Sequence, residues 1–427
     1  MARASQDPSS LDITVLRRWS WSVYDVMCAE CELVNGLNYF PVADHDTGYT
    51  QADFWAEFAS GLLVVRQSAG LGEAVAKAAS DVLVPGNSST ILGAWLLGLG
   101  AGLRDNAGPA ALAQALESAA RMAVASVPDP VAGTMLTVYE AAAQAARHAS
   151  APSTSISALV RYLERPIAAA LEACAVPVER LRTSGPPQDA GAYAMRIMFH
   201  MLAETLDPRP AAEFQLPPLP VPRLRPVACG QRLDPRHPRF EVQMRAIFPD
   251  ALRATVAAEL NRVGVDLAIT RIAPSDDGNE PTWNIHVHTE RPDDALSAIG
   301  KHGHILEHEI NTLIDNYIDG SASVDRQEPV RHLVIVSEDR PAPQLSTLLD
   351  TSEVVLVSTS DAGRLAAIRM ARVLRDQARR GKNRHHRAVT VVPARGKEQA
   401  VYALSSHDPA VPLGEASLRI YEAAQQA

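Results

Sequence analysis

The sequence predicts a multi-domain protein in which an all-helical domain is followed by a small α+β domain and then by a short α/β domain. A chain of 427 residues is too long for one ordinary domain. Up to about residue 206, apolar residues recur at helical spacing, whereas strand-like and helix-like stretches alternate after residue 230. Seven prolines between Pro208 and Pro226 separate the two regions, and so many prolines prevent both a helix and a central strand.

Residues 1–206 form the predicted helical domain. Two of its segments, "ALAQALESAARMAVA" and "TMLTVYEAAAQAARHA", place apolar residues along one face of a helix. Alternating runs typical of strands are almost absent from this part of the chain. Residues 207–230 are predicted to be an extended, proline-rich linker.

Residues 231–328 form the predicted α+β domain. Strands are expected at "RFEVQMRAIF", "VDLAITRIA" and "TWNIHVHT", and helices at "DALRATVAAELNRVG" and from about Asp293. Residues 329–427 contain the strand runs "HLVIVS", "EVVLVS" and "AVTVVP" and the helical stretch "AGRLAAIRMARVLRDQARR". This order of elements indicates a short parallel sheet with crossover helices.

The composition is that of a globular protein, with 47% hydrophobic and 21% charged residues. A formal net charge of -9 argues against a general nucleic-acid binder, whose affinity depends on neutralising phosphates. Four cysteines and no amino-terminal signal pattern lead us to expect a cytoplasmic protein. The apolar run at residues 91–103 is too short to span a bilayer, so no integral membrane segment is expected.

The segment "LNYFPVADHDTGYT", residues 37–50, contains two acidic residues, Asp44 and Asp46, in a turn. Two carboxylates at i and i+2 in a non-helical turn can bind the same Mg²⁺, which prefers hard oxygen ligands. Gly48 would allow a close approach of the backbone. Such pairs also occur in solvated turns without any ligand, so the motif alone leaves both interpretations open.

Five segments, taken in order, resemble a known family. "LVNGLNYFPVADHDTG", "PGNSSTILG", "DPVAGTMLTV" and "PPQDAGAYAM" resemble motifs of the DhaL-like nucleotide-binding domain of the dihydroxyacetone kinase superfamily. "TWNIHVHTERPDDALSAIGKHG" is similar to a middle-domain segment of the bacterial fatty acid kinase ATP-binding subunit, whose three-part layout the chain shares. Residues 329–427 resemble a shortened form of that subunit's DegV-like carboxy-terminal domain.

The resemblance implies a barrel of antiparallel helices whose loops at one end hold ATP through two Mg²⁺ ions. Asp44 and Asp46 would be the metal-bridging catalytic carboxylates, and Asn38 a third metal or nucleotide contact. Phosphoryl transfer needs positioning and charge neutralisation more than a protein nucleophile. The remaining cofactor-binding positions implied by the resemblance are Thr47, Gly48, Gly86, Asn87, Ser88, Gly133, Thr134, Asp189 and Gly191.

Several of these positions have an alternative role as helix caps. Ser88 or Ser89 would serve as the cap of the helix that follows Gly86, and Gly133-Thr134 also begins a helical run. Asp189 precedes the helical stretch "AYAMRIMFHML". The free N–H groups at a helix start favour a bound phosphate as well, so the two interpretations are compatible.

The sequence departs from the family pattern at four places. His45 and Ser89 replace glycines, Tyr49-Thr50 replaces Thr-Asn, and Ala132 replaces a glutamate. We expect the side chain at 45 to crowd the turn, because a position suited to glycine often has a positive φ or touches the ligand. A weakened or regulatory ATP binder is therefore an alternative to an active kinase.

His286 and His288 lie at i and i+2 on a predicted strand, so both rings project from one face and could share a zinc ion. In the related subunits a cysteine from the preceding strand completes such a site, and Glu241 stands at that position here. Cys229 in the linker is a further candidate ligand. Paired strand histidines are also often simple hydrogen-bonding groups.

Other motifs favour structural roles. Cys28 and Cys31 are expected inside one helix on a buried face, and the basic run at residues 379–387 is expected to solvate a helix end. Three further histidines are expected on a solvated helix: His302, His304 and His308.

The leading hypothesis is an ATP- and Mg²⁺-dependent kinase that phosphorylates a fatty acid carboxylate and forms an acyl phosphate. The resemblance implies that a separate DegV-like fatty-acid-binding partner presents the lipid, and that the chain forms a homodimer through the middle domain. A nucleotide-binding regulatory or scaffold protein is the second hypothesis. A dihydroxyacetone-type polyol kinase is the third, and the second and third domains argue against it.

Overall fold

The computed structural model describes residues 11–40, 42, 44–65, 70–103, 108–150, 153, 155–174, 188–208, 238–273 and 280–313. It also describes the backbone of three short strands at 333–336, 354–356 and 389–392. The predicted linker after Pro208, Cys229, the basic run at 379–387 and the predicted helix at 362–380 lie outside the described residues.

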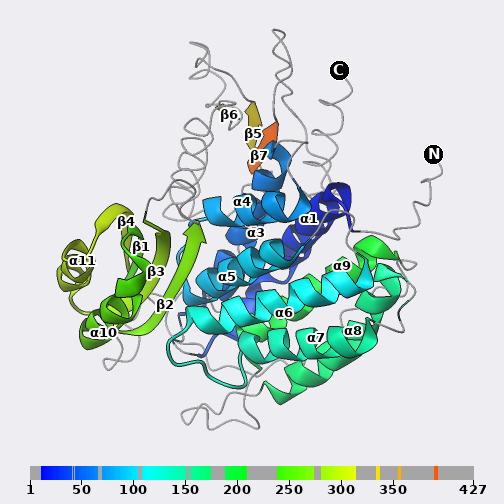
Figure 1. The fold of residues 1–427 in the computed structure, drawn as a ribbon, viewed down its shortest axis with the longest axis horizontal. Coiled ribbons are helices and arrows are strands. Elements are labelled where there is room, and N and C mark those ends of the chain that lie inside the picture. The colour runs from blue at the N-terminus through cyan, green and yellow to red at the C-terminus, as the bar shows by residue number, and fades with distance from the viewer. Residues whose placement is uncertain are drawn as a thin grey trace, which may run out of the picture.

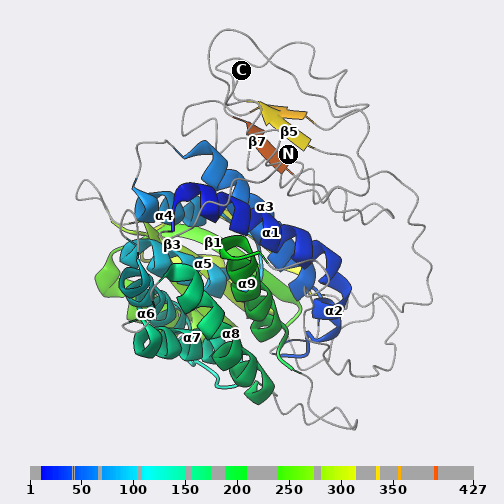
Figure 2. The same cartoon turned by 90° about the vertical axis from the view of Figure 1, so that its right-hand side faces the viewer.

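The first part of the chain is helical, as predicted (Figure 1). Successive long helices pack side by side, and the last of them, α9, returns to pack against α1 (Figure 2). The ring of helices is therefore closed, as expected for a helical barrel. The helices are α1 (Ile13–Ala29), α2 (Cys31–Gly36), α3 (Thr47–Val64), α4 (Leu71–Asp81), α5 (Asn87–Gly102), α6 (Pro109–Ser126), α7 (Met135–Ala149), α8 (Ile156–Ala173) and α9 (Ala190–Leu206).

Large aromatic residues fill the helical core. The Trp19 and Trp55 rings meet edge to face with centroids 5.2 Å apart, and the Trp95 ring stacks on Tyr139 at the same distance. The Trp19 indole N–H donates to Met198 O at 2.9 Å and so joins α1 to α9, which are distant in sequence. These contacts explain how an alanine-rich sequence fixes one arrangement of its helices.

The second part is a four-stranded antiparallel sheet with strand order β2-β3-β1-β4. Its strands are β1 (Phe240–Ile247), β2 (Gly264–Ala273), β3 (Thr282–Thr289) and β4 (His304–Thr312). A short 3-10 turn, η1 (Asp250–Leu252), leads into α10 (Arg253–Val263), and α11 (Pro292–Gly300) follows β3. Apolar residues of β1 and β3 pack against these two helices, as the alternating pattern predicts.

The opposite face of this sheet is polar and packs on the helical domain. In the register of β1 and β3, Glu241 pairs with His288, Gln243 with His286, and Arg245 with Asn284. The Arg245 guanidinium donates to Ser80 O at 3.1 Å and to Val82 O at 3.3 Å, at the end of α4. The sheet is thereby held beside the helical barrel.

Three described strands follow, with order β6-β5-β7: β5 (Leu333–Val336), β6 (Val354–Leu356) and β7 (Val389–Val392). β5 pairs in parallel with both neighbours, which agrees with the predicted parallel sheet.

The prediction of a helix through His302, His304 and His308 is wrong. Residues 304–312 form β4, which pairs antiparallel with β1, and both His304 and His308 are exposed. A spacing of four residues places two side chains on one face in a helix and also in a strand, so the pattern could not distinguish them. Residues 304–312 form a strand because their backbone pairs with β1.

The two amino-terminal cysteines lie on two helices instead of one, because α1 ends at Ala29 and α2 begins at Cys31. Neither cysteine forms a disulfide, and Cys31 is buried. Burial raises the pKa of Cys28 to about 12, which keeps this thiol protonated and suits the predicted packing role.

Within the described residues, every helix is too short or too polar to cross a membrane.

Candidate functional site

A cavity of about 490 Å³ lies between the helical barrel and the sheet. Because neighbouring helices of the barrel run in opposite directions, every second helix begins at the same end. The starts of α3, α5, α7 and α9 all line the cavity, so four positive helix ends converge on it. The lining residues at these starts are Asp46, Thr47, Gly86, Asn87, Ser88, Thr134, Met135, Asp189 and Gly191.

Asp44 and Asp46 both line the cavity, as does Asn38, whose side-chain amide donates to Asp44 Oδ1. Burial raises the pKa of Asp44 well above its usual range, and the nearby charges of Asp46 and Glu241 raise it further. Asp46 precedes α3, but its carboxylate makes no capping hydrogen bond to that helix. The predicted acidic turn therefore faces the cavity.

His45, between the two aspartates, adopts a left-handed backbone with φ of 56°. This conformation explains why the family pattern has glycine at this position. The imidazole packs edge to face against Tyr39 with centroids 5.3 Å apart, and His45 is not among the residues that line the cavity. The expected crowding of the turn by this side chain therefore does not reach the lining of the cavity.

Two predicted glycines serve the fold. The Gly48 N–H donates to Asn35 Oδ1 at 2.7 Å, and a Cβ on Gly48 would lie 2.3 Å from Cys31 O, so its close approach is to α2. Gly133 has φ of 84°, and its N–H donates to Thr137 Oγ1 at 2.9 Å. Neither residue lines the cavity.

The start of α5 combines a special backbone with unsatisfied polar atoms. Gly86, with φ of 111°, occupies the cap position, so the prediction of Ser88 or Ser89 as the cap is wrong. The buried atoms Asn87 Oδ1 and Ser89 Oγ have no hydrogen-bond partner in the described structure. Free N–H groups in the first turn, together with these atoms, suit a phosphate and its water shell.

Asp189 joins two helix starts. Its Oδ1 accepts from Ala192 N at 2.7 Å, which caps α9, and from Met135 N at 3.1 Å, the first residue of α7. Burial raises the pKa of this carboxyl to about 7. Asp189 therefore has the structural role that its sequence context allowed, and it also lines the cavity.

The sheet contributes Glu241 and His288 to the same cavity, with the fully buried His286 beside them. His286 Nε2 lies 3.1 Å from His288 Nε2, and His286 Nδ1 lies 3.4 Å from Glu241 Oε1. Burial, and then the neighbouring His288, lowers the pKa of His286 well below its usual range, and burial raises that of Glu241 to about 7. The two predicted metal sites thus adjoin one cavity.

Sequence reasoning missed Asp266 and Asn261, which also line the cavity. Asp266 Oδ2 lies 3.1 Å from His288 Nδ1. Its position depends on an irregularity in the pairing of β2 with β3, for which the sequence carries no signal.

Residues 41–204 match the DAK2 domain. This match agrees with the expectation of a DhaL-like domain in the helical region. The crystal structure of the dihydroxyacetone kinase from C. freundii in complex with AMP-PNP and Mg²⁺ is similar with 21% identity and a TM-score of 0.33. That alignment covers 48% of this chain and 36% of the kinase chain. None of the curated proteins matches the chain.

Two of the four departures from the family pattern turn away from the cavity. The Tyr49 hydroxyl donates to Glu32 Oε1 at 2.7 Å, and Ala132 is exposed in the loop before α7. Neither residue lines the cavity. These positions therefore supply no polar group to a bound ligand.

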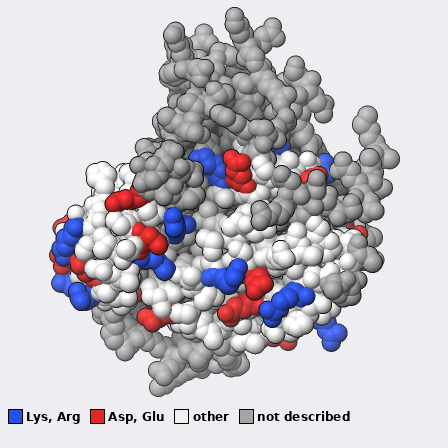
Figure 3. Space-filling model, viewed as in Figure 1, with Lys and Arg blue, Asp and Glu red and all other residues white. Residues whose placement is uncertain are grey.

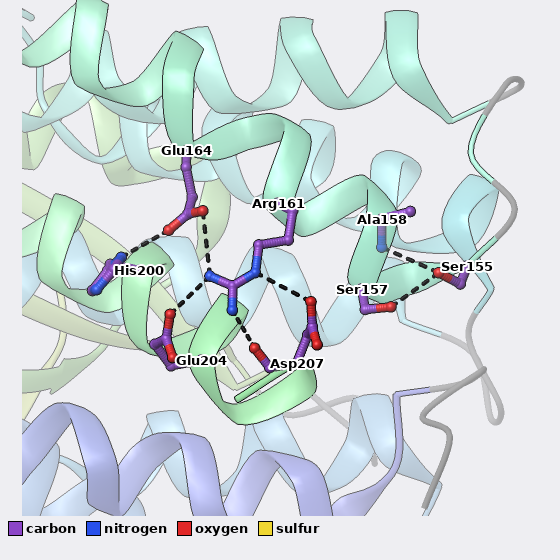
Figure 4. Close-up of polar contacts among 8 residues, drawn as sticks. All are labelled: Ser155, Ser157, Ala158, Arg161, Glu164, His200, Glu204 and Asp207. Atoms are coloured by element: carbon purple, nitrogen blue, oxygen red, sulfur yellow. Dashed lines mark hydrogen bonds and ion pairs between the residues drawn. The ribbon is translucent and has the colours of Figure 1, made fainter. Parts of the chain in front are cut away.

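A second group of possible metal ligands, Glu164, His200 and Glu204, lies on α8 and α9 (Figure 4). The Arg161 guanidinium already lies between the carboxylates, 2.8 Å from Glu204 Oε1 and 3.3 Å from Glu164 Oε2. It also contacts Asp207, at the end of α9. We interpret this group as an ion-pair network that anchors the end of α9.

On the face of the molecule in Figure 3, basic and acidic side chains of the described residues are interspersed, without a broad basic patch.

Proposed function

We propose that this protein transfers the γ-phosphoryl group of ATP to the carboxylate of a fatty acid and so forms an acyl phosphate. One observation carries the proposal: four helix starts and two aspartates converge on a cavity that a carboxylate–histidine group of the sheet also lines. The DAK2 match of residues 41–204 supports nucleotide binding at this cavity.

The residues present fit Mg²⁺ together with a triphosphate. Asp44, Asp46 and Glu241 bring three carboxylates to one poorly solvated cavity, and such a group requires a cation for charge balance. Asp44, Asp46 and Asn38 would hold Mg²⁺, which would neutralise charge on the transferring phosphoryl group. Gly86, Asn87, Ser88 and Thr134 would hold phosphate oxygens through the starts of α5 and α7.

The residues on the sheet side fit zinc. His286, His288 and Glu241 each offer one ligand atom, and these atoms lie within 4.8 Å of one another. Two imidazoles and one carboxylate are common zinc ligands, and three protein ligands leave a position for substrate. Zinc bound there would polarise an acceptor oxygen as a Lewis acid.

The fatty acid and its carrier are inferred from the sequence resemblance of the middle and last domains to the corresponding parts of fatty acid kinase subunits. We propose that a DegV-like fatty-acid-binding protein presents the acyl carboxylate to the cavity, and that two copies of the chain associate through the sheet domain. The strand β4, with the exposed side chains of Leu306 and Ile310, is the surface that favours such association.

Calorimetric titration of ATP in the presence of Mg²⁺ tests the nucleotide site. The variant with Asp44→Asn and Asp46→Asn should bind at least about 30-fold more weakly, because two charges that face the cation are lost. Asp250→Asn, an exposed aspartate of η1, is the matched control and should bind like the wild type. Equal affinity of all three proteins would exclude this site. Acyl phosphate formation with a lipid-loaded partner then tests the acceptor.

A nucleotide-binding regulatory protein is the second candidate function. It is favoured by Thr50 and Ala132, which stand where the family pattern has an asparagine and a glutamate and do not line the cavity. This candidate predicts Mg²⁺-dependent ATP binding without turnover, so the acceptor assay separates the two.

A further inference from the structure

The rings of His286 and His288 face each other through their Nε2 atoms, 3.1 Å apart. The other nitrogen of each ring has a partner of its own. His288 Nδ1 lies 3.1 Å from Asp266 Oδ2, and His286 Nδ1 lies 3.3 Å from Gln243 Oε1. These partners determine where the ring protons are.

On His288, the contact with Asp266 favours the tautomer with the proton on Nδ1. An ionised carboxylate can only accept a hydrogen bond, so the contact with Asp266 requires an N–H at Nδ1. The neutral ring then has its lone pair on Nε2, directed at His286.

On His286, the contact with Gln243 likewise favours a proton on Nδ1. The Gln243 side-chain N–H donates to Asn284 Oδ1 at 2.7 Å, which turns its Oε1 toward His286. That oxygen accepts from Nδ1–H, and Glu241 Oε1 lies 3.4 Å from the same nitrogen. This contact favours a lone pair on His286 Nε2 as well, so the 3.1 Å contact between the two Nε2 atoms would hold no proton and would suit a cation.

The left-handed backbone at Asp266 helps to direct its carboxylate at His288. Asp266 has φ of 55°, and the register of β2 with β3 shifts between Val265 and Ala268. Aspartate and asparagine tolerate a left-handed backbone better than most residues, and a bulge re-aims a side chain. At the start of β2, a Cβ on Gly264 would lie 2.5 Å from His288 O, so the backbones of β2 and β3 approach closely there and leave no room for a side chain.

We propose that Asp266 and Gln243 are positioning residues, which hold both histidines in the Nδ1–H tautomer so that the two Nε2 lone pairs converge on one divalent cation. The inference rests on the zinc site of the proposed function and adds the residues that prepare it. Partners of this kind orient ligands and raise their basicity, and their loss costs about 10- to 100-fold in metal affinity.

Zinc affinity of the full-length protein, measured by competition with a chromogenic chelator, tests the proposal. Asp266→Asn keeps an acceptor and tolerates a positive φ but loses the charge, so zinc should bind about tenfold more weakly. Glycine also adopts a positive φ but provides no acceptor, so Asp266→Gly should bind zinc about 100-fold more weakly. Glu290→Gln, an exposed carboxylate one residue after β3, is the control. Gln243→Met should also weaken zinc binding.

A second measurement does not depend on zinc. ¹⁵N spectra of histidine-labelled, metal-free protein should show Nε2 unprotonated in His286 and His288, and a change at His288 in Asp266→Gly. Unfolding of the metal-free variants should show an intact fold. Wild-type zinc affinity in both Asp266 variants, no zinc binding by the wild type, or protonated Nε2 atoms in its rings would overturn the inference. Titration of the wild type with ATP and Mg²⁺ tests the nucleotide site separately, so failure of the zinc inference and failure of the kinase proposal are distinguishable.

Discussion

Asp189 shows how one buried carboxyl can both join helices and make stability depend on pH. It accepts from the first turns of α7 and α9, and burial raises its pKa to about 7. The unfolded carboxyl titrates near its ordinary value, about 4. Between these values the folded chain binds more protons than the unfolded chain, so the contribution of Asp189 is fully present below pH 4 and is lost as the pH rises to 7.

We therefore expect Asp189→Asn to be more stable than the wild type at pH 8, by up to about 4 kcal/mol. Asparagine is as good a cap as aspartate but carries no charge to bury. The advantage should disappear as the pH is lowered to 4. Urea unfolding of both proteins across this range is the measurement, and parallel pH profiles would contradict the assigned pKa.

The role of the helix starts in nucleotide binding can be tested at two glycines with positive φ, one that lines the cavity and one that does not. Gly86 precedes α5 and lines the cavity, whereas Gly133 precedes α7 and does not. Alanine at either position should cost about 1–3 kcal/mol, because the backbone is strained for an L residue. Only Gly86→Ala should also weaken binding of ATP with Mg²⁺, since it displaces the first turn of α5. Equal nucleotide affinity in both variants would show that this turn does not hold phosphate.

The strands of the four-stranded sheet show which elements the sequence alone can predict. β1, β2 and β3 were predicted because their apolar residues alternate against α10 and α11. β4 was missed because its histidine spacing fits a helix equally well, and only pairing with β1 distinguishes them.

At the site, most residues implied by the family resemblance line the cavity, and many of them lie at helix starts. The prediction of a serine cap for α5 was wrong, because the cap position depends on the backbone conformation of Gly86. The role of Asp266 depends on a strand irregularity, and the meeting of the two metal-binding groups depends on how the domains pack, which local sequence does not encode.

At the scale of the whole molecule, the cavity exists only while the sheet stays on the barrel. Arg245 makes the best defined polar contact between them, since its guanidinium donates to Ser80 O and Val82 O and also lies 3.1 Å from Glu307 Oε1. Leucine at this position would leave the carbonyls unsatisfied and a carboxylate without its cation. The cost should be about 2–4 kcal/mol, and it should fall on the contact between the domains.

Calorimetric unfolding should then separate into two transitions in Arg245→Leu, one for the sheet and one for the barrel. Arg271→Leu, on an exposed position of β2, is the matched control and should unfold like the wild type. Binding of ATP with Mg²⁺ should weaken in Arg245→Leu as well, because Glu241 leaves the cavity with the sheet. If Arg245→Leu separates the transitions but binds nucleotide normally, the barrel alone forms the nucleotide site, and the sheet serves only the acceptor.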